Sequence, residues 1–224
     1  MELADMAGEI LLLVLVTRRG LWRTVPFFCG YLAWSLLADG ALSLALWRLS
    51  AAEYSYLYIQ QLPVDYMARF MVLSELVLAV WNRSQTRRSQ RMEFLLVGML
   101  LVGMLLLWPI TLKFTADNLS RHAALFTRMQ AEFSLMFVAC WLVLEGLRRK
   151  LSWDRRDPEV QIVRGFGAYA TVNLYVVLAR QDPGLNREDN YWLNAHLEMF
   201  GYLFLVSYWV FCFWGSRTRL DAEG

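Results

Sequence analysis

Long apolar stretches separated by short polar connections make up most of this chain. A helix of about 20 apolar residues is long enough to cross the roughly 30 Å hydrocarbon core of a bilayer. The pattern predicts an all-α fold, a polytopic membrane helix bundle with seven transmembrane helices in a single domain over residues 1–224. The predicted helices cover about residues 3–16, 25–47, 64–81, 94–112, 126–146, 162–179 and 191–214.

The first predicted helix is the shortest, because only residues 10–16 are continuously apolar. Such a segment crosses a bilayer only with tilt or local thinning, so six spans with an interfacial N-terminal helix is the alternative. Three acidic residues, Glu2, Asp5 and Glu9, precede the apolar part, whereas a signal peptide begins with a basic region. We therefore expect this segment to be retained as a first span.

Basic residues gather in every second connection, which predicts the orientation in the membrane. These connections contain "TRRGLWR", "NRSQTRRSQR" and "RRKLSWDRR", and the last residues contain "SRTR". The positive-inside rule places all four segments in the cytoplasm, with the N-terminus outside and the C-terminus inside. The formal net charge is only +2, so no nucleic-acid partner is expected. The expected partners are membrane lipids, with anionic headgroups at the basic connections, and a cytoplasmic protein at the same connections.

Polar side chains recur inside the predicted spans, where a charge at the bilayer centre costs roughly 2.5–3.5 kcal/mol on insertion scales. Most of them lie roughly 6–12 Å below the outer ends of six helices, at about 1.5 Å per residue. We predict that they line one outward-facing polar cavity. The candidate ligand-binding residues are Glu9, Asp39, Asp65, Arg69, Glu75, Glu132, Asn173, His196 and Glu198.

The segment "LPVDYMARFMVLSELVLAVW" carries three of these candidates within one predicted span. Asp65 and Arg69 are four residues apart, so they share a helix face and can form an ion pair. Pro63 followed by Asp65 is also typical of a helix start, where the carboxylate would only cap the helix. Both interpretations leave Asp65 with a structural role beside the ligand-binding one.

Glu75 lies about 15 Å beyond Asp65, near the predicted middle of the bilayer. It is either protonated or hydrogen-bonded, or it pairs with a group on another helix such as Arg128 or Asn173. Among the candidate residues, acids outnumber bases, and His196 is a further ionisable side chain. Such a site keeps some carboxyls neutral or attracts a cation, which can be a proton, a metal or an ammonium group. In the alternative, the acids bond to neighbouring hydroxyls and amides and only fix the helix packing.

Several kinds of cofactor chemistry find no support in the sequence. The last predicted helix has no lysine for a retinal Schiff base, and only His122 and His196 could ligate a haem. There is no His-Glu-x-x-His motif and no glycine-rich phosphate loop. The three cysteines lie in apolar stretches without a Cys-x-x-Cys pair. We therefore expect no cofactor, no metal and no disulfide.

Three segments carry a resemblance to a known group of proteins. They are "YSYLYIQQLPVDYMARF", "LFTRMQAEFSLMFVACWLVLEGLRRKLSWDRR" and "VRGFGAYATVNLYVVLAR". In these segments, and in length and loop pattern, the chain resembles a family of uncharacterised bacterial seven-span proteins common among acidobacteria. The resemblance implies seven helices and a place in the bacterial inner membrane, and it implies no activity.

The first functional interpretation is an integral membrane sensor or receptor-like protein whose cavity binds a small cationic or amphipathic ligand. The alternatives are proton- or cation-coupled transport with Glu75 and Asp39 as carriers, and a membrane-embedded hydrolase with a metal at His196. No internal repeat relates the two halves of the chain, which disfavours the inverted-repeat design of many transporters. A role other than catalysis is favoured.

Overall fold

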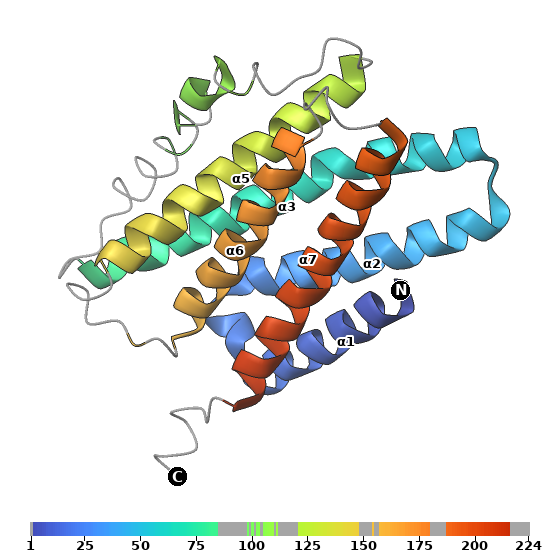
Figure 1. Cartoon of the computed structure of the whole chain (residues 1–224). Coiled ribbons are helices and arrows are strands. Elements are labelled where there is room, and N and C mark those ends of the chain that lie inside the picture. Colours follow the sequence, from blue (N-terminus) through green and yellow to red (C-terminus); the bar gives the residue numbers. More distant parts are fainter. Residues whose placement is uncertain are drawn as a thin grey trace. The chain divides into compact units, whose positions relative to one another are not determined.

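The computed structural model describes residues 2–84, 121–147, 154, 157–179 and 187–215, together with scattered positions between 98 and 111. Most of the predicted span 94–112 therefore lies outside the described residues. The elements with described bounds are α1 (Glu2–Arg18), η1 (Leu21–Arg23), α2 (Pro26–Arg48), α3 (Ala51–Ser84), α5 (Arg121–Leu147), α6 (Pro158–Ala179) and α7 (Arg187–Gly215) (Figure 1). No strand occurs within these ranges, and the prediction of an all-α helix bundle is confirmed.

Among the described residues, four helices are long and apolar enough to cross a membrane. They are α2, residues Thr127–Gly146 of α5, α6, and residues His196–Trp214 of α7. These helices support a membrane-embedded protein. The 17-residue α1 and the more polar α3 are not among them, so the seven-pass topology stays a prediction.

The chain divides into two compact units. Unit 1 comprises Met1–Glu75 and Val206–Gly224, and unit 2 comprises Leu76–Leu205. Both α3 and α7 contribute residues to each unit. The single domain over residues 1–224 stays a prediction, and each unit is described separately below.

In unit 1, α2 and α3 form an antiparallel hairpin (Figure 1). Only Leu49 and Ser50 connect them. Ser50 and Glu53 form a capping box at the start of α3, because the Glu53 carboxylate accepts hydrogen bonds from the Ser50 N–H (2.9 Å) and hydroxyl (2.7 Å). The same bonds lower the pKa of Glu53. The third helix therefore starts at Ala51, 13 residues before the predicted start at Val64.

The remaining helices of unit 1 pack on α2. A Cβ at Gly8 of α1 would lie 2.9 Å from Cγ1 of Val206 in α7, so these two helices approach closely. Phe28 of α2 is fully buried, and its ring packs edge-on against Trp209 of α7 with 5.0 Å between the ring centroids. The Gly8–Val206 contact and this aromatic packing together join α1, α2 and the end of α7 into one core.

In unit 2, α5 and α6 run antiparallel and very close together. The rings of Phe137 and Phe166 stack with their centroids 4.6 Å apart. A Cβ at Gly167 would lie 2.6 Å from Cβ of Trp141, which leaves room only for glycine. Arg164 of α6 also binds Glu145 of α5 through two nitrogens, with a shortest contact of 2.8 Å. Close contact and an ion pair thus fix one end of this helix pair.

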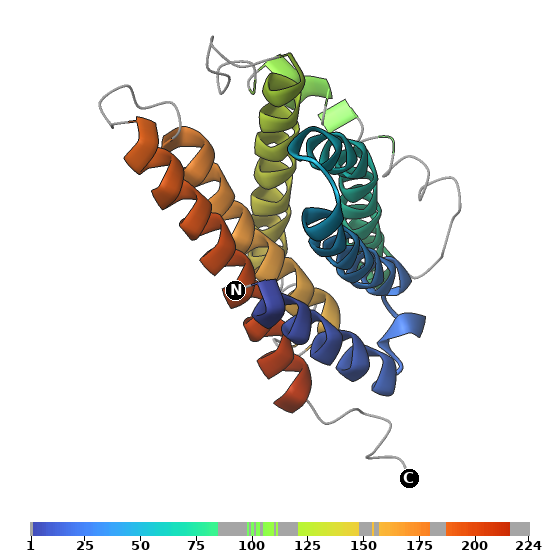
Figure 2. The ribbon, with the colours of Figure 1, turned by 90° about the vertical axis from the view of Figure 1, so that its right-hand side faces the viewer.

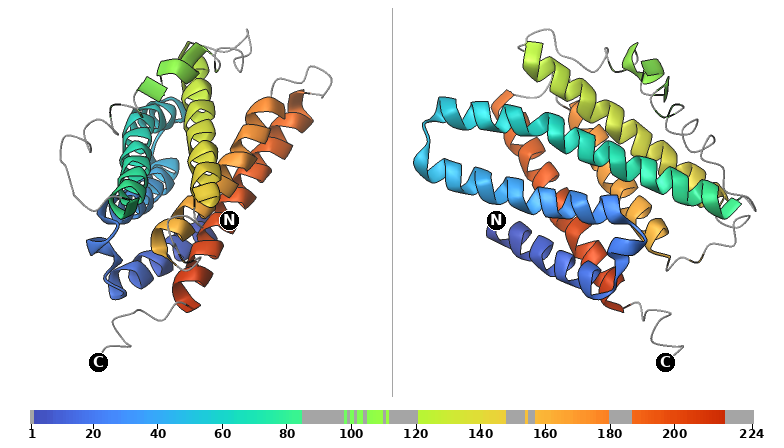
Figure 3. Two further views of the ribbon diagram at one scale, coloured as in Figure 1. Left: turned by 90° about the vertical axis from the view of Figure 1, so that its left-hand side faces the viewer. Right: turned by 180° about the vertical axis from the view of Figure 1, so that it is seen from behind.

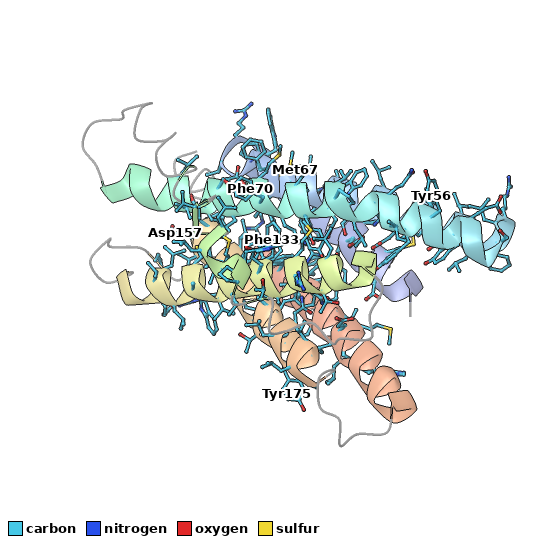
Figure 4. The ribbon with its side chains drawn as sticks, turned by 90° about the horizontal axis from the view of Figure 1, so that it is seen from above. Tyr56, Met67, Phe70, Phe133, Asp157 and Tyr175 are labelled. Atoms are coloured by element: carbon cyan, nitrogen blue, oxygen red, sulfur yellow. The ribbon has the colours of Figure 1, made fainter. Side chains whose placement is uncertain are left out.

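The start of α7 lies beside α6 in unit 2 (Figures 2 and 3). The rings of Tyr169 and Tyr202 are 5.9 Å apart. A Cβ at Gly201 would lie 3.2 Å from Cγ1 of Val172. On the opposite face of α6, Tyr175 is 59% exposed and points away from the neighbouring helices (Figure 4). One face of α6 therefore packs on α5 and α7.

Candidate functional site

Three candidate residues of unit 1 take part in two bonded pairs. The hydroxyl of Ser35 in α2 donates a 2.8 Å hydrogen bond to the fully buried Glu9 of α1. Asp65 and Arg69 of α3 form the predicted ion pair at 2.8 Å. The guanidinium of Arg69 also lies 5.9 Å from the ring centroid of Tyr66. These acids have partners within their own unit.

The helix register brings these two pairs to one level. Ala51 of α3 follows the end of α2, and Glu75 of α3 contacts its beginning. The Asp65–Arg69 pair therefore lies alongside Ser35, near the middle of α2. Asp39 lies one turn further along α2. Glu9, Asp39, Asp65 and Arg69 therefore lie at neighbouring levels of unit 1, and their clustering around one cavity stays a prediction.

Two details of the third helix were predicted incorrectly. Asp65 does not cap a helix start, because α3 begins at Ala51 and continues through Pro63. The depths shift for the same reason, since Asp65 lies beside the middle of α2 instead of at its outer end. Glu75, predicted near the bilayer middle, lies beside the first turn of α2.

Glu75 caps the beginning of α2. Its two carboxylate oxygens each accept a 3.0 Å hydrogen bond, one from the backbone N–H of Phe27 and the other from that of Phe28. The residue that precedes α2, Val25, offers no side-chain cap. The positive end of the α2 dipole favours a carboxylate at this position. Glu75 is thus hydrogen-bonded, as one interpretation predicted, and its donors are backbone N–H groups of α2.

Three buried polar residues of unit 2, Glu132, Asn173 and Glu159, each have an oxygen that accepts no hydrogen bond from a described residue. Glu132 of α5 and Asn173 of α6 are each only 2% exposed. The Oε1 atom of Glu132 and the Oδ1 atom of Asn173 accept no hydrogen bond from any described residue. Counting back from the Phe137–Phe166 pair places the two side chains within about one helical turn of the same level. Two helices therefore hold, at one level, oxygens that have no donor among the described residues.

The third helix of unit 2 adds a bonded pair at this level. The Gln130 side-chain amide of α5 donates a 2.8 Å hydrogen bond to the Glu198 carboxylate of α7. The contact of Gly201 with Val172 places Glu198 within about one turn of Asn173. We call Glu132, Asn173, Gln130 and Glu198, which share one level of the three helices, the unit 2 polar cluster. Gln130 and Glu132 are two residues apart on α5 and therefore point to different sides of that helix.

His196 does not belong to the buried part of this cluster. Its side chain is exposed, and its ring lies 6.4 Å from that of Phe200 on the same helix. Within the described ranges, no three His, Cys, Asp or Glu side chains lie close enough together to hold a metal ion. Cys29, Cys140 and Cys212 form no disulfide within the described residues.

The chemistry of the unit 2 polar cluster is that of a hydrogen-bond acceptor site. A buried oxygen without a donor costs about 1–3 kcal/mol, and burial of a carboxylate without a compensating charge costs more. A proton on Glu132, or a ligand that brings N–H groups, would remove this cost. The cluster therefore favours a proton or a cation with hydrogen-bond donors.

Sequence reasoning missed the groups that donate hydrogen bonds to the acidic side chains. The Ser50-x-x-Glu53 spacing is a recognised capping signal and could have located the start of α3. An α2 start without a Ser, Thr, Asp or Asn cap could have indicated an acceptor elsewhere in the fold. No sequence signal identifies Ser35 or Gln130 as partners, because both bonds depend on helix packing.

Comparison with protein-family models, with curated proteins and with solved structures finds no match for this chain.

Proposed function

We propose that the chain is a sensor or receptor-like protein of the bacterial inner membrane. It would cross the membrane seven times, with its N-terminus outside and its C-terminus in the cytoplasm, as the basic connections predict. It would bind a small cationic or amphipathic ligand in the unit 2 polar cluster and signal to a cytoplasmic partner. The observation that carries this proposal is the pair of buried acceptor oxygens on Glu132 and Asn173.

An ammonium group suits this cluster better than a neutral ligand. Glu132 and Asn173 offer acceptors, and an ammonium group offers up to three donors together with a charge that balances the carboxylate. Glu198 already accepts the bond from Gln130, which points to a different side of α5 from Glu132, so Glu198 would act on the ligand only through its charge at longer range. The site between α5, α6 and α7 would thus recognise the charge of the ligand first and its shape second.

The unit 1 acids are less suitable as the ligand site. Glu9 binds Ser35, Asp65 binds Arg69, and Glu75 binds backbone N–H groups of α2. A ligand would have to break these bonds before it could replace them. We therefore assign Glu9, Asp65, Arg69 and Glu75 to structural support of the receptor.

The test is thermal unfolding of the detergent-purified protein with choline, ethanolamine or putrescine as probes. We expect at least one probe to raise the melting temperature of the wild type and of Asp39→Asn, the unit 1 control. The Glu132→Gln and Asn173→Leu variants should lose the shift. An equal shift in Glu132→Gln, or a loss confined to Asp39→Asn, would reject the unit 2 cluster as the ligand site.

Coupled transport is a second candidate function. The observation that favours it is the buried Oε1 atom of Glu132, which accepts no hydrogen bond from a described residue. A buried carboxyl that binds and releases a proton can couple proton movement to transport. Glu75 is unsuitable as a carrier because α2 backbone donors hold both of its oxygens. Uptake of the bound probe into proteoliposomes under an imposed proton gradient would favour transport. Binding without uptake would favour the receptor.

A further inference from the structure

The connection between α1 and α2 has a defined shape that presents arginines at a membrane boundary. Gly20 adopts a left-handed conformation with φ 65°, which turns the chain out of α1. The short helix η1 follows, and the backbone N–H groups of Thr24 and Val25 both bond to the carbonyl of Leu21. Leu21 is 8% exposed and anchors the turn in unit 1. The first candidate membrane span begins directly afterwards, at Pro26.

The three arginines of this connection have different roles. Arg19 points back into unit 1, where its guanidinium donates a 2.9 Å hydrogen bond to the carbonyl of Trp214 at the end of α7. Arg18 and Arg23 are exposed. The guanidinium of Arg23 lies 5.0 Å from the centroid of the Trp22 ring, and that indole is itself 51% exposed. One arginine therefore fixes the fold, and two remain on the surface beside a tryptophan.

We propose that Arg18, Trp22 and Arg23 form a binding site for the headgroup of an anionic phospholipid. Tryptophan is enriched at the headgroup level of membranes. The planar fork of a guanidinium matches the oxygens of a phosphate. Residues 17–30 contain three arginines and no acid, so no carboxylate in the segment competes with the phosphate. The site requires that the chain lies in a membrane, and it does not depend on a ligand in the unit 2 polar cluster.

The chain carries its own matched control at the other end of α2. The tripeptide Leu-Trp-Arg occurs as Leu21-Trp22-Arg23 before the helix and as Leu46-Trp47-Arg48 at its end. Trp47 is 90% exposed and Arg48 is exposed. This second copy has no further arginine within the surrounding residues 24–68, and Glu53 follows it closely. Charge complementarity therefore favours phosphate at the first copy only.

The test is native mass spectrometry of the full-length protein released from nanodiscs that contain phosphatidylglycerol and phosphatidylcholine in equal amounts. We expect the wild type and Arg48→Gln to retain phosphatidylglycerol preferentially. The double variant Arg18→Gln/Arg23→Gln should retain one phosphatidylglycerol fewer per chain. The variant Arg18→Lys/Arg23→Lys should retain an intermediate amount, because lysine keeps the charge and loses the planar fork.

Two further arms make the result decisive. An excess of inorganic phosphate should displace little lipid, and displacement to the level of the double variant would instead indicate a site for free phosphate. Equal lipid retention by the wild type and the double variant would overturn the proposal. So would an equal loss in Arg48→Gln. Equal melting temperatures of all four proteins would show that the comparison concerns folded chains.

Discussion

Glu75 in unit 1 and Glu132 in unit 2 are buried to a similar degree, 8% and 2% exposed, yet their surroundings differ. Each oxygen of Glu75 accepts a backbone N–H at the uncapped start of α2. One oxygen of Glu132 accepts nothing from the described residues. Burial of an acid therefore does not by itself indicate function. The useful distinction is whether the described part of the fold supplies the donors, and in unit 2 a proton or a ligand would supply the donor that no described residue gives to that oxygen.

The largest effect should come from the same isosteric change at both positions. Glu75→Gln replaces one acceptor oxygen with a donor amide that faces a backbone N–H, and it removes the charge at the positive end of α2. We expect a loss of about 2–4 kcal/mol in unfolding free energy. Glu132→Gln removes a buried carboxylate without breaking a bond to Oε1, so its effect should stay within about 1 kcal/mol.

Thermal unfolding of both variants in the same detergent provides the measurement. A melting temperature for Glu132→Gln as low as that for Glu75→Gln would show that Glu132 is also held by structural bonds. In that case the contrast between the two units would disappear. An unchanged Glu75→Gln would show instead that water satisfies the start of α2.

The second prediction concerns the close packing that holds the unit 2 polar cluster in place. In Gly167→Ala the new methyl group would overlap Trp141 and push α5 away from α6. We expect a loss of about 1–3 kcal/mol from this overpacking and a loss of probe binding by the cluster. Gly30→Ala is the control, because a Cβ at Gly30 meets no atom within 4 Å. Alanine there should raise stability by up to about 1 kcal/mol, again measured as a melting temperature.

The opposite result would also be informative. If Gly167→Ala binds the probe as the wild type does, the geometry of Glu132 and Asn173 does not depend on the contact between α5 and α6. The cluster would then lose its main structural support as a ligand site.

The third prediction asks whether Asp65 and Arg69 serve only to neutralise each other's charge. Arg69→Leu leaves Asp65 without its ion-pair partner and should cost about 1–3 kcal/mol. The double variant Asp65→Leu/Arg69→Leu removes both charges and should recover most of that loss. The two melting temperatures, compared with that of Asp65→Leu, form a double-mutant cycle. A double variant at least as unstable as Arg69→Leu would indicate that the charges have further partners.

The positions of the helices could be predicted more fully from the sequence than the environments of the acids. Apolar length placed α2, α5, α6 and α7 within a few residues of their bounds, because membrane spans require long apolar runs. The polar first half of α3 lacks that signal. Its helical start depends on Ser50 and Glu53, and the 13-residue error shifted the depth of every candidate on this helix.

The sequence predicted which polar residues are candidates, but it did not predict which groups form hydrogen bonds with them. The ion pair of Asp65 and Arg69 is local, so a spacing of four residues sufficed. The donors to Glu9 and Glu75 come from residues at least 26 positions away. Such pairs depend on which helix faces pack together, and a single sequence does not specify those faces.

The smallest effect should come from the capping box of α3, which is exposed and local. Its hydrogen bonds lower the pKa of Glu53, mainly through the Ser50 hydroxyl. An acid with a lowered folded-state pKa stabilises the fold above its ordinary value of 4.5, and that contribution is lost as the pH falls through the lowered pKa. Ser50→Ala should therefore reduce the melting temperature slightly at pH 7, and the difference from the wild type should shrink below about pH 4.

Glu53→Gln is the control for this last prediction, because it has no carboxyl group to titrate at this position. Its difference from the Glu53→Gln/Ser50→Ala double variant should stay constant across the same pH range. A pH-independent difference between the wild type and Ser50→Ala would show that the ionised carboxylate of Glu53 contributes nothing to the cap. The start of α3 would then depend on the backbone and the Ser50 hydroxyl alone. In contrast to Glu75, an acid at the surface would satisfy a helix end without stabilising it.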